Sequence, residues 1–299
     1  MSDSTMSDST TATPSRASPS GVLARLGTLV PSLRESERKI ADYILANPEE
    51  IIYLSVTELA DRTDTSEATV IRFAQRLGYS GYAALKITLT IDRRDGAPPL
   101  PSDLSPEAGL TAIKRKIIQA NIESLNDTAQ VLDDEALAQA VEALTNAAHI
   151  EAYGVGGSAV VAHDAYFMLM QIGLPIIALT DPHLQMMSAV QLRKGDTALA
   201  ISLSGSTRDT IEALQAARDA GATCMCITRY ARSPITRVAH ITLLAAARPA
   251  TVGGHDLLGR VAQLAVIDVL AAAITLTRPE ASIDALARGR RAISASRKL

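Results

Sequence analysis

The chain has no tryptophan, two phenylalanines and seven tyrosines, so aromatic side chains make up only 3% of its 299 residues. Proteins that bind RNA or single-stranded nucleic acid usually stack bases on aromatic rings. The scarcity of aromatics therefore argues against that class. Hydrophobic residues still amount to 47%, so aliphatic side chains must build the cores, and the length suits one large or two ordinary domains.

An excess of positive charge is also missing, because 29 Lys and Arg residues face 32 Asp and Glu residues and the net charge is −3. DNA binding would therefore have to rest on a local motif. The two cysteines, Cys224 and Cys226, lie in an apolar run that is typical of a buried strand. A lone pair with this spacing predicts core packing rather than a disulfide or a metal site. We expect no metal and no cofactor.

Long apolar runs are absent as well, since none reaches the roughly 18 residues of a membrane span. The N-terminus has no apolar signal-peptide core. These absences predict a cytoplasmic protein that does not contact a membrane. Residues 1–20 are rich in Ser, Thr and Asp, and they repeat Met-Ser-Asp-Ser-Thr twice. Such a segment cannot bury apolar surface, so we expect a disordered tail.

Prolines divide the rest of the chain into two parts. Residues 21–92 have a helical pattern, and residues 93–106 contain four prolines that forbid a continuous helix and predict a linker. Residues 107–299 begin with two helical stretches and then alternate apolar runs with helical segments. The runs that we expect to be strands are 150–155, 175–180, 197–202, 222–228 and 240–244. This alternation predicts a three-layer α/β domain with a five-stranded parallel sheet, following an all-α domain.

Residues 54–78 have the pattern of two short helices around a polar turn. Ser66 is a good N-cap for the second helix, and Gly78 is placed to end it. The apolar positions of that helix fall at helical spacing and predict a buried face: Val70, Phe73, Ala74 and Leu77. Helix, short turn, helix is the arrangement that places a second helix in the major groove of DNA.

The opposite face of the second helix is polar, and the side chains that we expect at double-stranded operator DNA are Ser66, Glu67, Thr69, Arg72 and Arg76. Arg72 is the best base reader, because arginine can bond a guanine edge with two hydrogen bonds. A solvated helical hairpin would show the same pattern. Acids slightly outnumber bases between residues 22 and 91, so one helix would hold phosphates weakly and we expect a dimer.

Residues 33–86 contain three further motifs: Ala46-Asn-Pro-Glu-Glu50, Ser66-x-Ala-Thr-Val-x-Arg72-Phe73 and Leu77-Gly-Tyr-x-Gly-Tyr82. Through these motifs the segment resembles the N-terminal domain of the RpiR/MurR family of bacterial transcriptional regulators. It implies a helix-turn-helix domain that binds DNA. The family's turn usually has glycine where this chain has Asp64, and aspartate also tolerates a left-handed turn conformation.

Two turns rich in glycine and serine follow predicted strands. The first is Gly154-Val-Gly156-Gly157-Ser158, and the second is Ser202-Leu-Ser204-Gly205-Ser206-Thr207. Glycine lets the backbone approach a ligand, and a helix N-terminus offers free N–H groups to an anion. A tight turn with a helix cap needs only one hydroxyl, so two such loops favour a phosphate site.

The first loop also matches a dinucleotide-binding fingerprint, as Gly154-x-Gly156-x-x-Ala159, with Asp181 in the place of the acid that binds ribose. Asp181 lies nearly 30 residues on, where the fingerprint expects roughly 20. The fingerprint also leaves the second loop unexplained. We therefore expect no dinucleotide.

Residues 138–273 resemble the sugar isomerase (SIS) domain, mainly through Gly154-x-Gly-x-Ser158 and Ile201-Ser-x-Ser-Gly-x-Thr207. That domain follows the N-terminal domain in RpiR regulators and binds phosphosugars. The resemblance implies phosphate contacts at Ser158, Ser202, Ser204 and Thr207, beside Gly156 and Gly157. Ser206 sits at a variable position of the loop and is a weaker candidate for an effector contact. His255 has two interpretations: it is a surface loop residue, or it contacts the sugar across a dimer interface.

Together the two resemblances predict a DNA-binding regulator of sugar metabolism genes, controlled by a phosphorylated sugar and assembled as a homodimer or tetramer. The alternative is a phosphosugar isomerase with an accessory helical domain. An isomerase needs a positioned base with a tuned pKa. The candidates are Asp209, Glu212, His255 and Asp256. None of them lies in a recognisable catalytic motif, so we expect no enzymatic activity.

Overall fold

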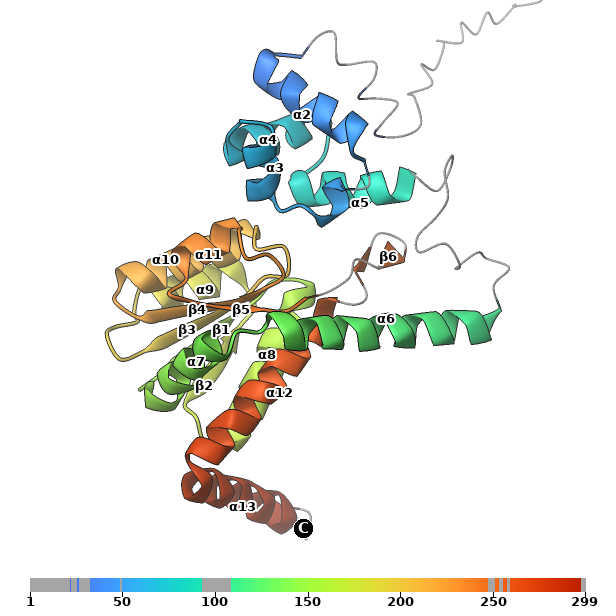
Figure 1. Ribbon diagram of the computed structural model, residues 1–299. Helices are drawn as coiled ribbons and strands as arrows, with labels where there is room; N and C mark the ends of the chain where they lie inside the picture. Colours follow the sequence, from blue (N-terminus) through green and yellow to red (C-terminus); the bar gives the residue numbers. More distant parts are fainter. Residues whose placement is uncertain are drawn as a thin grey trace, which may run out of the picture.

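The computed structural model describes residues 22, 26, 33–48, 50–92, 109–246, 251–252, 255–256 and 259–296. The predicted tail at 1–20 and linker at 93–106 lie outside the described residues. Figure 1 shows a helical domain that sits above one edge of an α/β domain.

The helical domain consists of α2 (Glu35–Ala46), a short 3-10 helix η2 (Ile51–Tyr53), α3 (Val56–Arg62), α4 (Glu67–Arg76) and α5 (Tyr82–Asp92). Its helices pack around an aliphatic core with a single phenylalanine, and the fully buried members include Ile40, Ile44, Leu59, Phe73 and Leu85. The predicted buried face of the second motif helix is confirmed, since Val70, Phe73, Ala74 and Leu77 all belong to this core.

The α/β domain is built on a five-stranded parallel sheet, which confirms the predicted fold class. Its strands are β1 (Ile150–Tyr153), β2 (Ile176–Leu179), β3 (Thr197–Ile201), β4 (Thr223–Thr228) and β5 (Ile241–Leu244). The strand order is β2-β1-β3-β4-β5, and every neighbouring pair is parallel. The order reverses between β1 and β3, because the chain adds β2 on one side of β1 and the remaining strands on the other.

Helices cover both faces of this sheet. One face carries α7 (Asp134–Asn146), α8 (Gly157–Gln171) and α12 (Gly259–Thr277), with α6 (Leu110–Val131) against α12. The other face carries α9 (Pro182–Ala189), α10 (Arg208–Asp219) and α11 (Pro234–Val238). Alternate strand residues enter separate cores, as Leu199 and Met225 do on one side and Cys224 and Cys226 on the other. Both cysteines are buried and free, so their predicted role in the core is confirmed.

Several elements were not predicted from the sequence. They are the short helices α9 and α11, the final helix α13 (Pro279–Ser296), and a hairpin of β6 (Thr251–Val252) and β7 (His255–Asp256). Asp181 is the N-cap of helix α9, because its carboxylate accepts a hydrogen bond from the backbone N–H of Leu184 at 3.0 Å. Pro182 is the first residue of the helix. This combination is a recognisable helix start.

Within the described ranges, α12 is the only helix long and apolar enough to cross a membrane by length and composition, with a mean hydropathy of 1.6. Arg260 and Asp268 lie within it, which is why no uninterrupted apolar run appears in the sequence. The helix packs against α6, α7 and α8, and it buries Val266, Leu270 and Ile274 in the core. Helix α12 therefore makes the contacts of a core helix that covers one face of the sheet.

Candidate functional site

The α3–turn–α4 unit has the local geometry that its sequence predicts. Asp64 in the turn takes the left-handed conformation with a φ of 49°, and Gly78 after α4 has a φ of 91°. Ser66 caps α4, because its Oγ accepts a hydrogen bond from the Thr69 N–H at 3.2 Å. The two helices are thereby fixed at a tight corner, as a helix-turn-helix requires.

Three of the five residues predicted to meet DNA lie at the outer surface of α4. Ser66 and Arg72 are exposed and Thr69 is half-buried. The Oγ of Ser66 lies 2.8 Å from the Oγ1 of Thr69, so these hydroxyls form a polar pair at the start of the helix. Among the residues that the structure describes, the Arg72 side chain makes one hydrogen bond, a long one of 3.4 Å from its Nη2 to Thr69 Oγ1. Its guanidinium can therefore turn toward a base edge.

The other two predicted residues are engaged inside the protein. Arg76 pairs with Glu37 of α2. Burial raises the pKa of Glu37, but hydrogen bonds from the backbone of Arg34 and from Arg76 outweigh it, and the pKa is lowered. Glu67 accepts a hydrogen bond from Thr57 and forms two bonds of 3.0 Å with Arg237 of the α/β domain. The roles of Arg76 and Glu67 in DNA binding remain predictions.

The first predicted phosphate loop joins β1 to α8. A Cβ at Gly154 would lie 2.5 Å from the Ser158 carbonyl oxygen, so only glycine allows strand and helix to approach this closely. Gly156 has a φ of 60° and occupies the N-cap of α8. Gly157 and Ser158 form the first turn of that helix, where the Ser158 N–H donates to the Val155 carbonyl at 3.2 Å and the Ala159 N–H donates to the Gly156 carbonyl at 3.1 Å. The loop thus places the Ser158 hydroxyl at the positive end of the helix dipole.

The second loop joins β3 to α10 and brings its hydroxyls together. The Oγ of the buried Ser202 lies 3.1 Å from Thr207 Oγ1, which belongs to the N-cap residue of α10. Ser204 Oγ accepts a hydrogen bond of 3.2 Å from the Ser206 N–H, and Ser206 Oγ donates one of 3.2 Å to the Ser204 carbonyl. The hydroxyl of Ser206 therefore has a hydrogen-bond partner within the loop.

These two loops lie beside each other because β1 and β3 are neighbouring strands. Tyr153 at the end of β1 pairs with Ala200 near the end of β3, and adjacent strands are about 4.8 Å apart. The strand order reverses at this place. Ligands of open α/β sheets bind in the crevice at such a reversal, outside the carboxyl ends of the strands. Two helix N-termini, those of α8 and α10, add favourable partial charge for an anion.

Gln185 is a residue of this site that the sequence did not reveal. It is fully buried on α9, and its Nε2 donates to the Gly154 carbonyl at 3.1 Å and to the Leu179 carbonyl at 2.9 Å. The side chain thus ties the first loop to the end of β2. Helix α9 was not predicted, so nothing placed Gln185 here, although Asp181-Pro182 marks the start of that helix.

The remaining candidates have other surroundings. His255 lies in β7, paired with Val252 of β6. Asp181 caps α9, which gives its carboxylate a structural partner in place of a ribose. Glu212 forms an ion pair of 2.7 Å with Arg208 one helical turn away, and Asp209 is exposed. The buried Glu151 accepts hydrogen bonds from Tyr153 and Ser188, so both of its oxygens are occupied.

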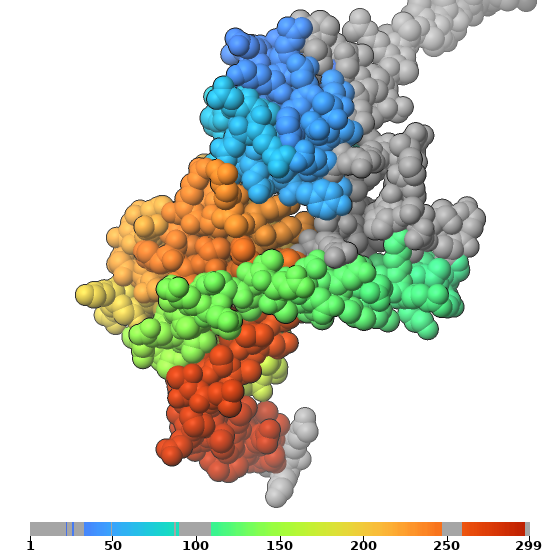
Figure 2. All heavy atoms as spheres, in the orientation of Figure 1, coloured from blue at the N-terminus to red at the C-terminus, as the bar shows by residue number. Residues whose placement is uncertain are grey.

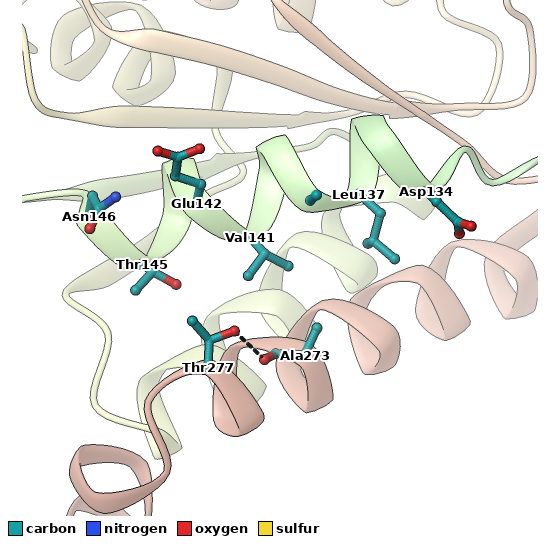
Figure 3. Close-up of a pocket in the computed structure, with 9 residues that line it drawn as sticks. Asp134, Leu137, Val141, Glu142, Thr145, Asn146, Ala273 and Thr277 are labelled. Carbon is teal, nitrogen blue, oxygen red and sulfur yellow. Dashed lines mark hydrogen bonds between the residues drawn. The ribbon is translucent and has the colours of Figure 1, made fainter.

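A separate groove of about 510 Å³ lies between α7 and α12 (Figure 3). Leu137, Val141 and Ala273 supply apolar lining, and Thr277 Oγ1 donates to the Ala273 carbonyl at 2.9 Å. Asn146 at one end precedes the amino end of β1, whereas the phosphate loops follow the carboxyl ends of the strands. The groove is therefore distinct from the loop site.

Comparison with known proteins agrees with this geometry. A model described as the helix-turn-helix domain of the rpiR family matches residues 20–95, and the SIS domain model matches residues 143–273. An HTH-type transcriptional regulator of Caldanaerobacter subterraneus subsp. tengcongensis is 42% identical over 83% of this chain and 88% of its own. The chain belongs to the RpiR family of HTH-type transcriptional regulators. The regulator HexR of Escherichia coli is 32% identical, over 92% of this chain and 95% of its own.

Two solved structures extend the likeness to the fold. The NanR protein of Vibrio vulnificus, complexed with ManNAc-6P, is 30% identical with a TM-score of 0.77, and the match covers 91% of this chain and 97% of that one. The sugar isomerase domain of an RpiR transcription factor from Sphaerobacter thermophilus is 32% identical with a TM-score of 0.56, covering 60% and 98%. The curated relatives named above are regulators rather than enzymes.

Proposed function

We propose that this RpiR-family regulator binds an operator through α4 and that a phosphorylated sugar, bound between the loops after β1 and β3, controls it. The observation that supports the sugar site is the meeting of two loops rich in hydroxyl groups at the reversal of strand order. The complex of NanR with ManNAc-6P supports the class of ligand. In this proposal residues 21–92 bind DNA, residues 93–106 link the domains, and residues 107–299 bind the effector.

The phosphate would occupy the mouth of the crevice. Ser158 and Ser204 would donate hydrogen bonds to it from opposite loops, and the positive ends of the α8 and α10 helix dipoles would favour its negative charge. Hydrogen bonds to a charged group are each worth about 1.5–3 kcal/mol, roughly twice those between neutral groups. The pair Ser202–Thr207 would shape the second loop and supply further hydroxyls.

The DNA-bound form would be a homodimer on an inverted repeat. The helical domain has little positive charge, so a single copy would hold phosphates weakly. Two copies related by a twofold axis present two recognition helices to half-sites one helical turn apart. Such a regulator of sugar metabolism genes would work in the cytoplasm, without a membrane or a cofactor.

A thermal-shift screen tests the effector site. The panel is ManNAc-6P, glucose 6-phosphate and fructose 6-phosphate, with the same sugars without phosphate and inorganic phosphate alone as controls. A ligand that binds only the native state raises Tm. We expect at least one sugar phosphate to raise Tm in the wild type, with a much smaller rise in Ser158→Ala. An equal rise in both proteins would contradict the site.

The DNA site is tested by selecting duplexes from a random pool with the wild-type protein. We expect the enriched sequences to contain an inverted repeat, and a footprint to cover both half-sites. Protection of one asymmetric half-site by a monomer would contradict the dimer.

An isomerase built on the same SIS fold would need a base positioned beside the sugar. Of the candidate bases, Glu212 is paired with Arg208, Asp209 is exposed, and His255 and Asp256 lie in the β6–β7 hairpin. The buried Glu151 is bonded to Tyr153 and Ser188, so its carboxylate is also engaged. We propose that the chain is not an enzyme. Incubation with each sugar phosphate of the panel should leave its NMR spectrum unchanged, whereas signals of an isomer would overturn this.

A further inference from the structure

One short segment of the α/β domain, residues 228–238, lies between the second phosphate loop and the DNA-binding domain. Toward the loop, the Arg229 N–H donates to the Leu203 carbonyl at 3.2 Å and the Ile235 N–H donates to the Gly205 carbonyl at 3.0 Å. Gly205 is so close to Ser233 that a Cβ on the glycine would lie 2.2 Å from the serine Oγ. Any shift of the loop must therefore move this segment, which we call the relay segment.

The other side of the relay segment contacts α3 of the DNA-binding domain. The Arg232 guanidinium lies 2.5 Å from the Asp61 carboxylate. The Ser55 Oγ, at the N-cap of α3, donates to the Arg232 carbonyl at 2.6 Å. Side chain and backbone of one arginine thus hold both ends of this helix.

The relay segment also reaches α4 and α5. Arg237 forms its two bonds of 3.0 Å with Glu67, the first residue of α4. Lys86 of α5 donates to the Tyr230 hydroxyl at 3.2 Å and lies 5.0 Å from the centre of that ring. Figure 2 shows the helical domain seated directly on this part of the α/β domain.

The contact at Glu67 matters because the N-terminal end of a recognition helix enters the major groove. That end of α4 is joined to α11 through the Glu67–Arg237 pair, so the α/β domain lies directly beside the end of the helix that would enter the groove. The contacts also account for two acidic side chains of the DNA-binding domain that would repel the phosphates of DNA. Asp61 and Glu67 face Arg232 and Arg237, so their carboxylates are neutralised by these ion pairs while the domains are in contact.

We propose that the relay segment holds the DNA-binding domain in a docked form that excludes DNA, and that occupancy of the second phosphate loop shifts the docking equilibrium. The inference rests on the proposed function, since it assumes that α4 reads DNA and that the loop binds a sugar phosphate. Both ion pairs are partly exposed, with side-chain exposures of 66% and 48% for Arg232–Asp61 and 61% and 22% for Arg237–Glu67. Partly exposed pairs are individually weak. Weak contacts suit a switch, because a ligand shifts an equilibrium only by its differential affinity for the two states.

The test compares three variants of the full chain. Arg232→Ala/Arg237→Ala removes both guanidinium groups from the interface, and Arg232→Lys/Arg237→Lys keeps the charges. Arg193→Ala removes an exposed arginine from the opposite, amino edge of the sheet as a matched control. Hydrogen exchange without DNA reports docking directly. We expect faster exchange in peptides covering 55–62 in the alanine variant only, and exchange equal to wild type there would overturn the docking contacts.

The second readout is fluorescence anisotropy with a duplex that the wild type has selected from a random pool. Loss of two weak pairs should tighten binding of the alanine variant roughly three- to tenfold, despite its lower positive charge. The lysine variant and Arg193→Ala should stay close to wild type. Unchanged or weaker binding by the alanine variant would overturn the claim that docking excludes DNA.

The third readout adds the sugar phosphate that raises the wild-type Tm. The ratio of DNA affinities with and without it should move toward one in the alanine variant, because the coupling passes through the docked form. A ratio equal to wild type would overturn the relay. Failure of the proposed function looks different, because the wild type itself would then select no duplex or respond to no sugar phosphate.

Discussion

The backbone of Gly205 packs against the side chain of Ser233, and a Cβ at Gly205 would lie 2.2 Å from the serine Oγ and 2.5 Å from its Cβ. Gly205 also has a φ of 63°, which L side chains rarely adopt. Gly205→Ala should therefore lower the free energy of unfolding by about 1–3 kcal/mol, the cost of one strained residue. Denaturant melts would measure it. Gly289→Ala in α13 meets no atom within 4 Å and serves as the control, since alanine there should not destabilise.

Arg72→Ala should abolish specific operator binding while the fold stays intact, because Arg72 is exposed on α4. A bidentate contact to a guanine is worth about 1–3 kcal/mol, and a dimer loses two of them. Anisotropy with the selected duplex measures the loss, and a thermal melt checks the fold. Arg72→Lys keeps the positive charge but lacks the planar guanidinium group. Its affinity for the operator should therefore fall between those of the wild type and of Arg72→Ala. Wild-type affinity in the alanine variant would remove Arg72 from the interface.

Ser158→Ala and Ser204→Ala should each weaken binding of the sugar phosphate tenfold or more, since hydrogen bonds to charged groups are worth about 1.5–3 kcal/mol. DNA affinity without the effector should stay as it was. Ser206→Ala is the matched control, because the Ser206 hydroxyl is already bonded to the Ser204 carbonyl. Isothermal titration measures the affinities. If both serines only shape their loops, the variants would lose stability and still bind the effector normally.

The two thiols should be unreactive in the native protein. Burial raises the pKa of Cys224 and of Cys226 to about 12. Titration with a disulfide reagent at pH 8 should detect no thiol in the folded chain and two after denaturation. The raised pKa values also set a pH dependence. Their contribution to stability is complete below the unfolded pKa of about 8.5 and is lost as pH rises toward 12. A fast-reacting native thiol would show that β4 opens locally.

Local sequence patterns predicted most of the two domains. The five apolar runs became the five strands, and the turn residue Asp64 takes the left-handed conformation expected of it. Helix α11 has five residues, too few for a helical period to show. In helix α9 the polar Gln185 is buried and the apolar Met187 is exposed. The pattern of hydrophobic residues therefore does not show which face of this helix is buried.

Contacts between the domains could not be predicted in this way. Glu67 was placed on the DNA-facing side of its helix by periodicity alone, yet it meets Arg237, which lies 170 positions along the chain. No local pattern links two such residues. The two turns after β1 and β3 were predictable for the opposite reason, since glycine and serine that follow a buried strand mark a turn into a helix within a few positions. Their binding of a phosphate stays a prediction.

The reversal of strand order has an evolutionary consequence. The loops after β1 and β3 lie beyond the ends of their strands, and Ser158, Ser202 and Ser204 belong to neither of the cores on the two faces of the sheet. If these loops bind the effector as proposed, substitutions there would alter which small molecule is recognised while the packing of both helical layers stays intact. A lineage would in this way acquire a new effector by changing a few loop positions and keep the same scaffold, whereas Gly154 and Gly205, which lie in close contact with neighbouring atoms, must remain as they are.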